Sequence, residues 1–96
     1  MTARVQEVSI VLREVNTPRE LHECLMNALN FPGWYGHNWD AFWDAITGLV
    51  DMPHRLRFIG WSILEDRLPT EAQKLRECLE EMQMRLPELA ACVSYE

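Results

Sequence analysis

The sequence lacks any apolar run near the roughly 18 residues that a membrane-spanning helix needs, and its first residues show no signal-peptide pattern. It also lacks a CxxC pair, because its three cysteines, Cys24, Cys78 and Cys92, stand far apart. Their odd number favours free, buried thiols in a reducing cytoplasm, with a disulfide between two of them as the alternative. We therefore expect a cytoplasmic protein that is not bound to a membrane.

Positive charge is scarce, and it is missing from the middle of the chain. Nine Lys and Arg residues face fifteen Asp and Glu residues, for a net charge of -6, and none of the nine lies between Arg19 and Arg55. A negative chain repels polyanions, so direct binding of nucleic acid is disfavoured. An acidic balance serves either solubility or a basic protein partner. The 96 residues predict one small domain, residues 1–96, and the 48% apolar content is too high for a disordered chain.

Catalytic and metal-binding motifs are also missing. The sequence has no phosphate-cradling glycine loop, no nucleophile elbow and no HExxH. Tyr35, His37, Asp40 and Asp44 are the groups that acid–base catalysis could use, but no catalytic motif surrounds them. The three histidines and Cys24 show no metal-ligand spacing, and lone histidines of this kind are expected at the surface or in loops. We expect no enzyme activity, no catalytic residues, no metal site and no cofactor.

What the sequence does contain is an alternation of strand and helix patterns. Segments rich in apolar and β-branched residues predict strands at 5–12, 56–61 and 89–95. Apolar residues at helical spacing predict helices at 17–30, 38–47 and 69–86, whereas 49–53 is a connection and 62–68 has no defined pattern. This order is typical of α/β domains with right-handed crossovers. We expect an α/β fold: a small single domain with a three-stranded, mainly parallel sheet packed with three to four helices.

Local signals predict where the helices begin and end. Thr17 as N-cap and Pro18 at the first helical position begin the first helix, which should end near Asn30. Asn38 is the expected N-cap of the second helix, and Gly48 is expected just beyond its end. The last helix has an apolar stripe at Ala72, Leu75, Leu79, Met82 and Leu86.

Residues 31–48, FPGWYGHNWDAFWDAITG, gather aromatic side chains beside carboxylates that no nearby cation neutralises. Asp40 and Asp44 lie one helical turn apart, and Trp43 falls at the border of their face. An aromatic anchor beside two acids is typical of a binding hot spot, although both acids could simply be solvated surface groups. Trp34, in a glycine-flanked loop, is either exposed or a plug over the sheet edge. The rotation of about 100° per residue places Trp39, Phe42 and Ile46 on a core face and Asp40, Asp44 and Thr47 on a solvent face.

This stretch resembles the barstar family of intracellular ribonuclease inhibitors, and a weaker resemblance covers nearly the whole chain. The motif is carried by Pro32, Tyr35, Gly36, Asn38, Asp40, Ala41, Trp43, Asp44, Thr47 and Gly48. The resemblance implies a barstar-like fold and a bacterial immunity protein, as in toxin–antitoxin pairs. Such a protein binds a basic, secreted or delivered ribonuclease and plugs its active site. The implied assembly is a monomer that forms a 1:1 heterodimer with that ribonuclease.

The resemblance also implies roles for individual residues. Asp44 matches the family's central acid, which takes the place of an RNA phosphate in the nuclease, and Asp40 matches a second interface acid. Trp34 stands where the family has a smaller aromatic that stacks on the nuclease's catalytic histidine. The other implied partner-binding residues are Gly36, Asn38, Trp43, Leu49, Val50, Asp51 and Glu81. The alternative function is a protein-interaction module of the same fold with a non-nuclease partner.

Overall fold

The computed structural model describes residues 4–96, which form a three-stranded parallel sheet and a set of helices. The elements in chain order are β1 (Glu7–Val11), α1 (Pro18–Leu29), α2 (Trp39–Asp44), the π-helix η1 (Ala45–Leu49), β2 (Arg55–Ile59), α3 (Trp61–Arg67), α4 (Pro69–Arg85) and β3 (Cys92–Tyr95). The strand order is β1-β2-β3, with Val8 opposite Leu56 and Leu56 opposite Val93. The predicted α/β fold is confirmed, and both strand pairings are parallel.

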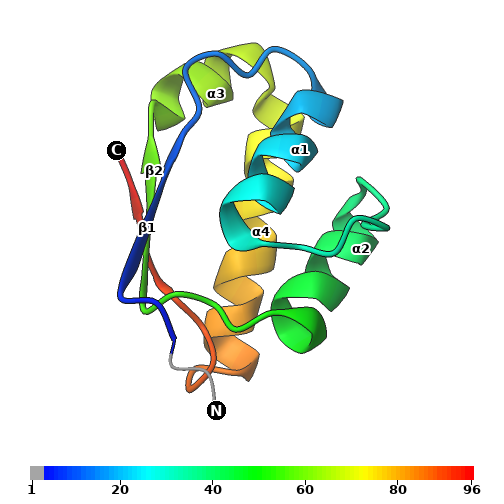
Figure 1. The fold of residues 1–96 in the computed structure, drawn as a ribbon. Coiled ribbons are helices and arrows are strands. Elements are labelled where there is room, and N and C mark those ends of the chain that lie inside the picture. The colour runs from blue at the N-terminus through cyan, green and yellow to red at the C-terminus, as the bar shows by residue number, and fades with distance from the viewer. Residues whose placement is uncertain (1–3) are drawn as a thin grey trace.

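The helices lie on one face of the sheet (Figure 1). Because the strand order never reverses direction, right-handed crossovers bring both helical connections to the same side. Ile10, Leu56 and Phe58 are buried beneath them and form the sheet's part of the core. The apolar stripe predicted for α4 is confirmed at Ala72, Leu75, Leu79 and Met82, which are buried, and Leu86 is partly buried. The core therefore lies between the sheet and one layer of helices.

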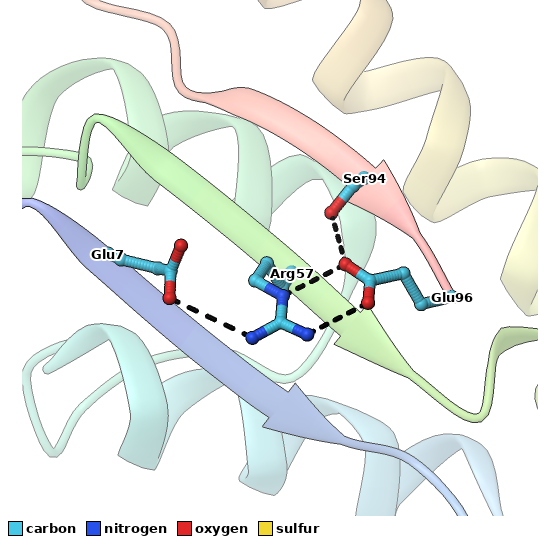
Figure 2. A network of polar contacts seen from close by, with 4 residues as sticks. All are labelled: Glu7, Arg57, Ser94 and Glu96. Atoms are coloured by element: carbon cyan, nitrogen blue, oxygen red, sulfur yellow. Dashed lines mark hydrogen bonds and ion pairs between the residues drawn. The ribbon is translucent and has the colours of Figure 1, made fainter.

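The opposite face of the sheet is open and carries a polar network (Figure 2). Arg57 donates to the two carboxylate oxygens of Glu96 at 2.9 and 2.8 Å, and it lies 3.8 Å from a carboxylate oxygen of Glu7. The Ser94 hydroxyl donates to Glu96 at 2.7 Å. Parallel sheets are usually covered on both faces. Here polar and charged side chains from the three strands, with Glu96 just beyond β3, occupy the face that a second layer of helices would otherwise cover.

The cysteines are free, as predicted, but they differ in exposure. Cys24 and Cys78 are half-buried, and burial raises the pKa of both thiols. The prediction of burial is wrong for Cys92, which is exposed at the start of β3, opposite Arg55 in the strand register. The reason is that the open face of the sheet has no apolar layer to cover it.

The boundary after β2 differs from the prediction. The strand ends at Ile59, and Gly60 takes a left-handed backbone conformation with φ 84°. A Cβ atom at this position would lie 2.8 Å from Cγ of Arg13, so only glycine fits without a shift. Trp61 therefore begins α3 and is buried, and the prediction that it belongs to the strand is wrong. The segment 62–68, which had no predicted structure, is mostly helical.

The last strand is shorter than predicted. It begins at Cys92, because residues 87–89 form a turn after α4. In that turn the backbone N–H groups of Leu89 and Ala90 both donate to the oxygen of Leu86 at 3.0 Å. The predicted start at residue 89 is wrong for this reason.

The predicted start of α1 is confirmed. Thr17 is its N-cap and accepts a hydrogen bond from the N–H of Glu20 at 3.1 Å, and Pro18 is its first residue. Asn30 ends the helix in the left-handed conformation, with φ 59°. The backbone N–H of Asn30 donates to the oxygen of Met26, so the helix ends in a closed last turn before the loop begins.

The end of the second helical segment differs from the prediction. Gly48 lies inside η1 rather than beyond the helix end. The turn is widened, because the N–H of Val50 donates to the oxygen of Ala45, five residues earlier, at 3.1 Å. The Thr47 hydroxyl donates to the oxygen of Trp43 at 2.6 Å. The helical segment thus runs without a break from α2 into η1.

Candidate functional site

The loop between α1 and α2 displays a large aromatic side chain. Trp34 is 74% exposed, so the alternative of a plug over the sheet edge is excluded. Its neighbour Tyr35 points the other way and is buried, with its hydroxyl 2.6 Å from Nδ1 of His22. The N–H of Tyr35 also donates to the oxygen of Pro32 at 3.0 Å. One buried tyrosine therefore holds the loop while the adjacent tryptophan faces solvent.

Asn38 connects this loop to α2. Its side-chain oxygen accepts from the N–H of Ala41 at 2.7 Å, which confirms Asn38 as the N-cap. Its side-chain nitrogen donates to the oxygen of Gly36 at 3.1 Å, and a Cβ atom on Gly36 would lie 3.1 Å from that nitrogen. Both residues are exposed, and the side-chain amide of Asn38 already has two hydrogen-bond partners within the chain.

An open hollow separates α2 from α4. Asp40 and Asp44 are exposed on its α2 side, and Trp43 is half-buried between them, which confirms its position at the border of core and solvent. Glu81 reaches the same hollow from α4. The full lining is Trp39, Asp40, Trp43, Asp44, Cys78, Glu81 and Arg85. Carboxylates from α2 and α4 thus line the same hollow as the rings of Trp39 and Trp43.

The core face of α2 is only partly as predicted. Phe42 and Ile46 are fully buried. Trp39 packs against the core but is only half-buried, and its indole N–H donates to Oε1 of Glu71 on α4 at 3.3 Å. The prediction that Trp39 belongs to the core face is therefore wrong in part, because its ring also lines the hollow.

Two groups from α4 in this hollow were missed by the sequence reading. Arg85 lies 3.6 Å from Glu81, one helical turn away, and is the one cation among the lining residues. Cys78 is half-buried there, and its thiol pKa is raised first by burial and then by the nearby Glu81 and Glu77 carboxylates. The four-residue spacing of Glu81 and Arg85 is a signal that could have found the ion pair.

A second hollow follows where η1 ends. Leu49 is 45% exposed, Val50 is half-buried and Asp51 is exposed, and all three line this hollow. Arg4 and Leu89 line its far side. The structure thus brings four of the predicted contact residues into the hollow between α2 and α4 and three into the hollow at the end of η1. The other three, Trp34, Gly36 and Asn38, lie in the loop before α2 or at its N-cap and line neither hollow.

His22 is placed differently from the prediction. A surface or loop position was expected, but the side chain is only 2% exposed and lies on α1 behind the loop. Burial lowers its pKa, the Glu71 carboxylate partly opposes this, and His37 adds to the lowering. Within residues 4–96 no group of three or more His, Cys, Asp or Glu side chains is arranged to hold a metal ion. None of the helices in that range is long and apolar enough to cross a membrane.

The fold and the site together define a class: a small α/β protein with aromatic and acidic side chains exposed on one helical segment and the loop before it. The family model described as Barstar (barnase inhibitor) matches residues 5–93. A Bacillus subtilis (strain 168) protein named "Putative ribonuclease inhibitor YrdF" is 33% identical over 82 residues, which cover 85% of this chain and 90% of that protein. The chain therefore belongs to the barstar family. Inhibition of a ribonuclease is the activity for which both the family and this relative are named.

Proposed function

We propose that the protein is an immunity-type inhibitor that binds a basic ribonuclease and closes its active site. The observation that carries this proposal is the hollow where the exposed Asp40 and Asp44 carboxylates, the half-buried Trp43 and Glu81 meet. A ribonuclease must hold RNA phosphates, so its active site is cationic. Carboxylates in such a site form charge-assisted hydrogen bonds, which are stronger than neutral ones.

Each acid has a distinct role in this proposal. Asp44 is the central group and occupies the position of an RNA phosphate, and Asp40 contacts a neighbouring cation. The two lie at i and i+4 on one helix, where like charges repel by a few tenths of a kcal/mol. Cations of the partner would relieve that repulsion, so part of the binding free energy comes from removing an unfavourable interaction in the free protein.

The exposed aromatic and the second hollow extend the interface. Trp34 supplies a large, rigid contact area at a low cost in conformational entropy. Leu49, Val50 and Asp51 provide a rim beyond the acidic centre, with Gly36 and Asn38 at the opposite end. The negative charge of the chain steers a basic partner toward this face and raises the association rate. The proposed assembly is one protein molecule bound to one ribonuclease in the cytoplasm of the producing cell.

A mixing experiment tests the proposal. The protein is titrated into barnase and a panel of other basic, guanyl-preferring ribonucleases while RNA cleavage is followed. We expect at least one enzyme to be inhibited at a one-to-one ratio, with weaker inhibition at high salt. Inhibition of no ribonuclease, together with tight binding to a non-nuclease protein, would favour the interaction module instead.

A matched pair of variants tests the residue assignment. Asp44→Asn keeps the side-chain shape and removes the charge, and Asp66→Asn makes the same change at an exposed position on α3 that does not line the hollow. Loss of one charge-assisted hydrogen bond costs about 1.5–3 kcal/mol, so Asp44→Asn should weaken inhibition about tenfold or more. Asp66→Asn should leave it unchanged. Equal inhibition by both variants would overturn the role given to Asp44.

A further inference from the structure

Among residues 4–96, His22 is the one buried residue of polar or charged type, whereas the buried hydrophobic residues include Tyr35 and Trp61, which each carry one polar atom. His22 lies on α1 and lines neither hollow, and no role in binding follows from its position alone. Polar groups are seldom buried without a partner, because desolvation is costly. The contacts that satisfy this imidazole therefore indicate what it does.

His22 contacts the segment that displays Trp34 at two points. Its Nδ1 atom lies 2.6 Å from the Tyr35 hydroxyl, and its ring centre lies 4.4 Å from that of Trp39. Tyr35 directly follows Trp34, and Trp39 is the first residue of α2. A single ring on α1 thus packs behind the loop at its middle and at its end.

The Tyr35 hydroxyl extends this link to the backbone of the helix cap. Besides the contact with His22, it lies 3.4 Å from the backbone oxygen of Asn38. When Nδ1 of His22 carries the proton, His22 donates to Tyr35 and Tyr35 donates to Asn38. In the other tautomer Tyr35 donates to His22. The bond between the two side chains is kept in both cases, so α1 and the loop stay connected.

We infer that His22 is a positioning residue: through Tyr35 and Trp39 it holds loop 31–38 in the conformation that presents Trp34, and it does not touch the partner itself. The consequence for binding rests on the proposed function. The consequence for the order of the loop is independent of the proposed function, and it can be measured on the free protein.

The charged groups around His22 predict how its contacts with the loop respond to pH. His37 faces it from the loop and Glu71 from α4, beside the neutral Tyr35. Burial lowers the pKa of His22 below its ordinary value of 6.5, so the unfolded chain takes up this proton before the native state does. Native order around the imidazole is therefore fully present above that value and falls as the pH drops below it.

Amide hydrogen exchange on the free protein tests the positioning role. The probes are the N–H of Tyr35, bonded to Pro32, and the N–H of Ala41, bonded to Asn38. Tyr35→Phe removes the hydroxyl and His22→Leu removes the ring nitrogens. Either should speed exchange at both probes about fivefold to tenfold, the value of one neutral hydrogen bond.

Two further measurements separate positioning from general weakening of the fold. The sheet amide of Leu12, bonded to Ile59 at 2.8 Å, should exchange at the wild-type rate in both variants. His22→Asn places an amide near the Nδ1 position and should restore slow exchange in the loop. It should also remove the loss of loop protection, measured against the intrinsic exchange rate at each pH, that we expect in the wild type as the pH falls below about 6.5. Equal acceleration of loop and sheet amides, or no acceleration at all, would overturn the inference.

Binding to barnase is the second test of the positioning role. If the wild type binds, His22→Leu and Tyr35→Phe should each weaken binding about fivefold to tenfold, with rescue by His22→Asn. The double variant should lose no more than either single variant, because both changes break the same bond. If the wild type binds no ribonuclease, the proposed function fails, and the exchange experiment still decides the role of His22 in the loop.

Discussion

Arg4 donates a hydrogen bond of 2.7 Å from Nε to the backbone oxygen of Met52, 48 positions later in the chain. Its other guanidinium nitrogens reach the oxygen of Pro53 and the oxygens of residues 88–90. One planar cation therefore joins the N-terminal segment, the segment after η1 and the turn after α4. The second hollow of the proposed interface is built around this junction.

Arg4→Gln should lower the free energy of unfolding by about 1–3 kcal/mol, because it removes several hydrogen bonds from a charged donor to backbone oxygens. Arg19→Gln is the control, since Arg19 makes only an exposed i,i+4 ion pair with Glu23 and should cost about 0.5 kcal/mol or less. Urea unfolding of both variants measures the difference. Equal losses would show that the junction adds nothing beyond an ordinary surface charge.

Trp34→Ala and Trp43→Ala should separate binding from stability. Trp34 is exposed, so its removal should change the unfolding free energy by no more than about 0.5 kcal/mol while weakening ribonuclease binding. Trp43 is half-buried, and its loss should cost about 1–3 kcal/mol of stability as well as binding, less than a fully buried tryptophan. Thermal unfolding and titration calorimetry check both. An unchanged melting temperature for Trp43→Ala would contradict its position at the border of the core.

Arg85→Gln should tighten ribonuclease binding. Arg85 is the one cation lining the acidic hollow, where it competes with the cations of a basic partner. Its ion pair with Glu81 is largely exposed, so its loss should change stability by about 0.5 kcal/mol or less. Lys74→Gln, an equal charge change on α4 outside the hollow, is the control. Association rates at low salt measure the effect, and weaker binding by Arg85→Gln alone would refute the competition.

The network on the open face should resist acid. Hydrogen bonds from Arg57 and then from Ser94 lower the pKa of Glu96 to about 2, from an ordinary value of 4.5. The stabilising effect of this carboxylate is therefore present above about pH 4.5 and is lost as the pH falls through the native pKa near 2. An NMR titration of the Glu96 carboxyl carbon checks the shift. In Arg57→Gln the titration should move back toward the ordinary value, and an unmoved midpoint would exclude Arg57 as the main cause.

Elements whose ends depend on neighbouring residues could be predicted from the sequence. Thr17 and Asn38 each cap a helix through a hydrogen bond to an N–H three residues ahead, which is a local signal. The widened turn of η1 and the early end of β2 could not be predicted in this way. The widened turn depends on the hydrogen bond from the N–H of Val50 to the oxygen of Ala45. The early end of β2 depends on the close approach of Arg13 to Gly60.

The same distinction holds for the candidate site. Asp40, Trp43 and Asp44 share one helix, so their common face follows from helical rotation alone. His22 and Arg4 could not be assigned in this way, because their partners lie between 13 and 86 positions away along the chain. Their roles depend on which segments the fold brings together, and no spacing in the sequence encodes that.

The open face of the sheet also has a practical use. Cys92 lies there exposed, on the side away from the helices that carry the acidic hollow, whereas Cys24 and Cys78 are half-buried and burial raises the pKa of both thiols. Thiol reagents react with accessible thiolates, so a maleimide dye or biotin should attach at Cys92 first. Molecules tethered to a sensor chip through the Cys92 sulfur would all display Trp34 and Asp44 to the solution. The uncovered face of the sheet thus offers an attachment point for measuring the capture of a ribonuclease.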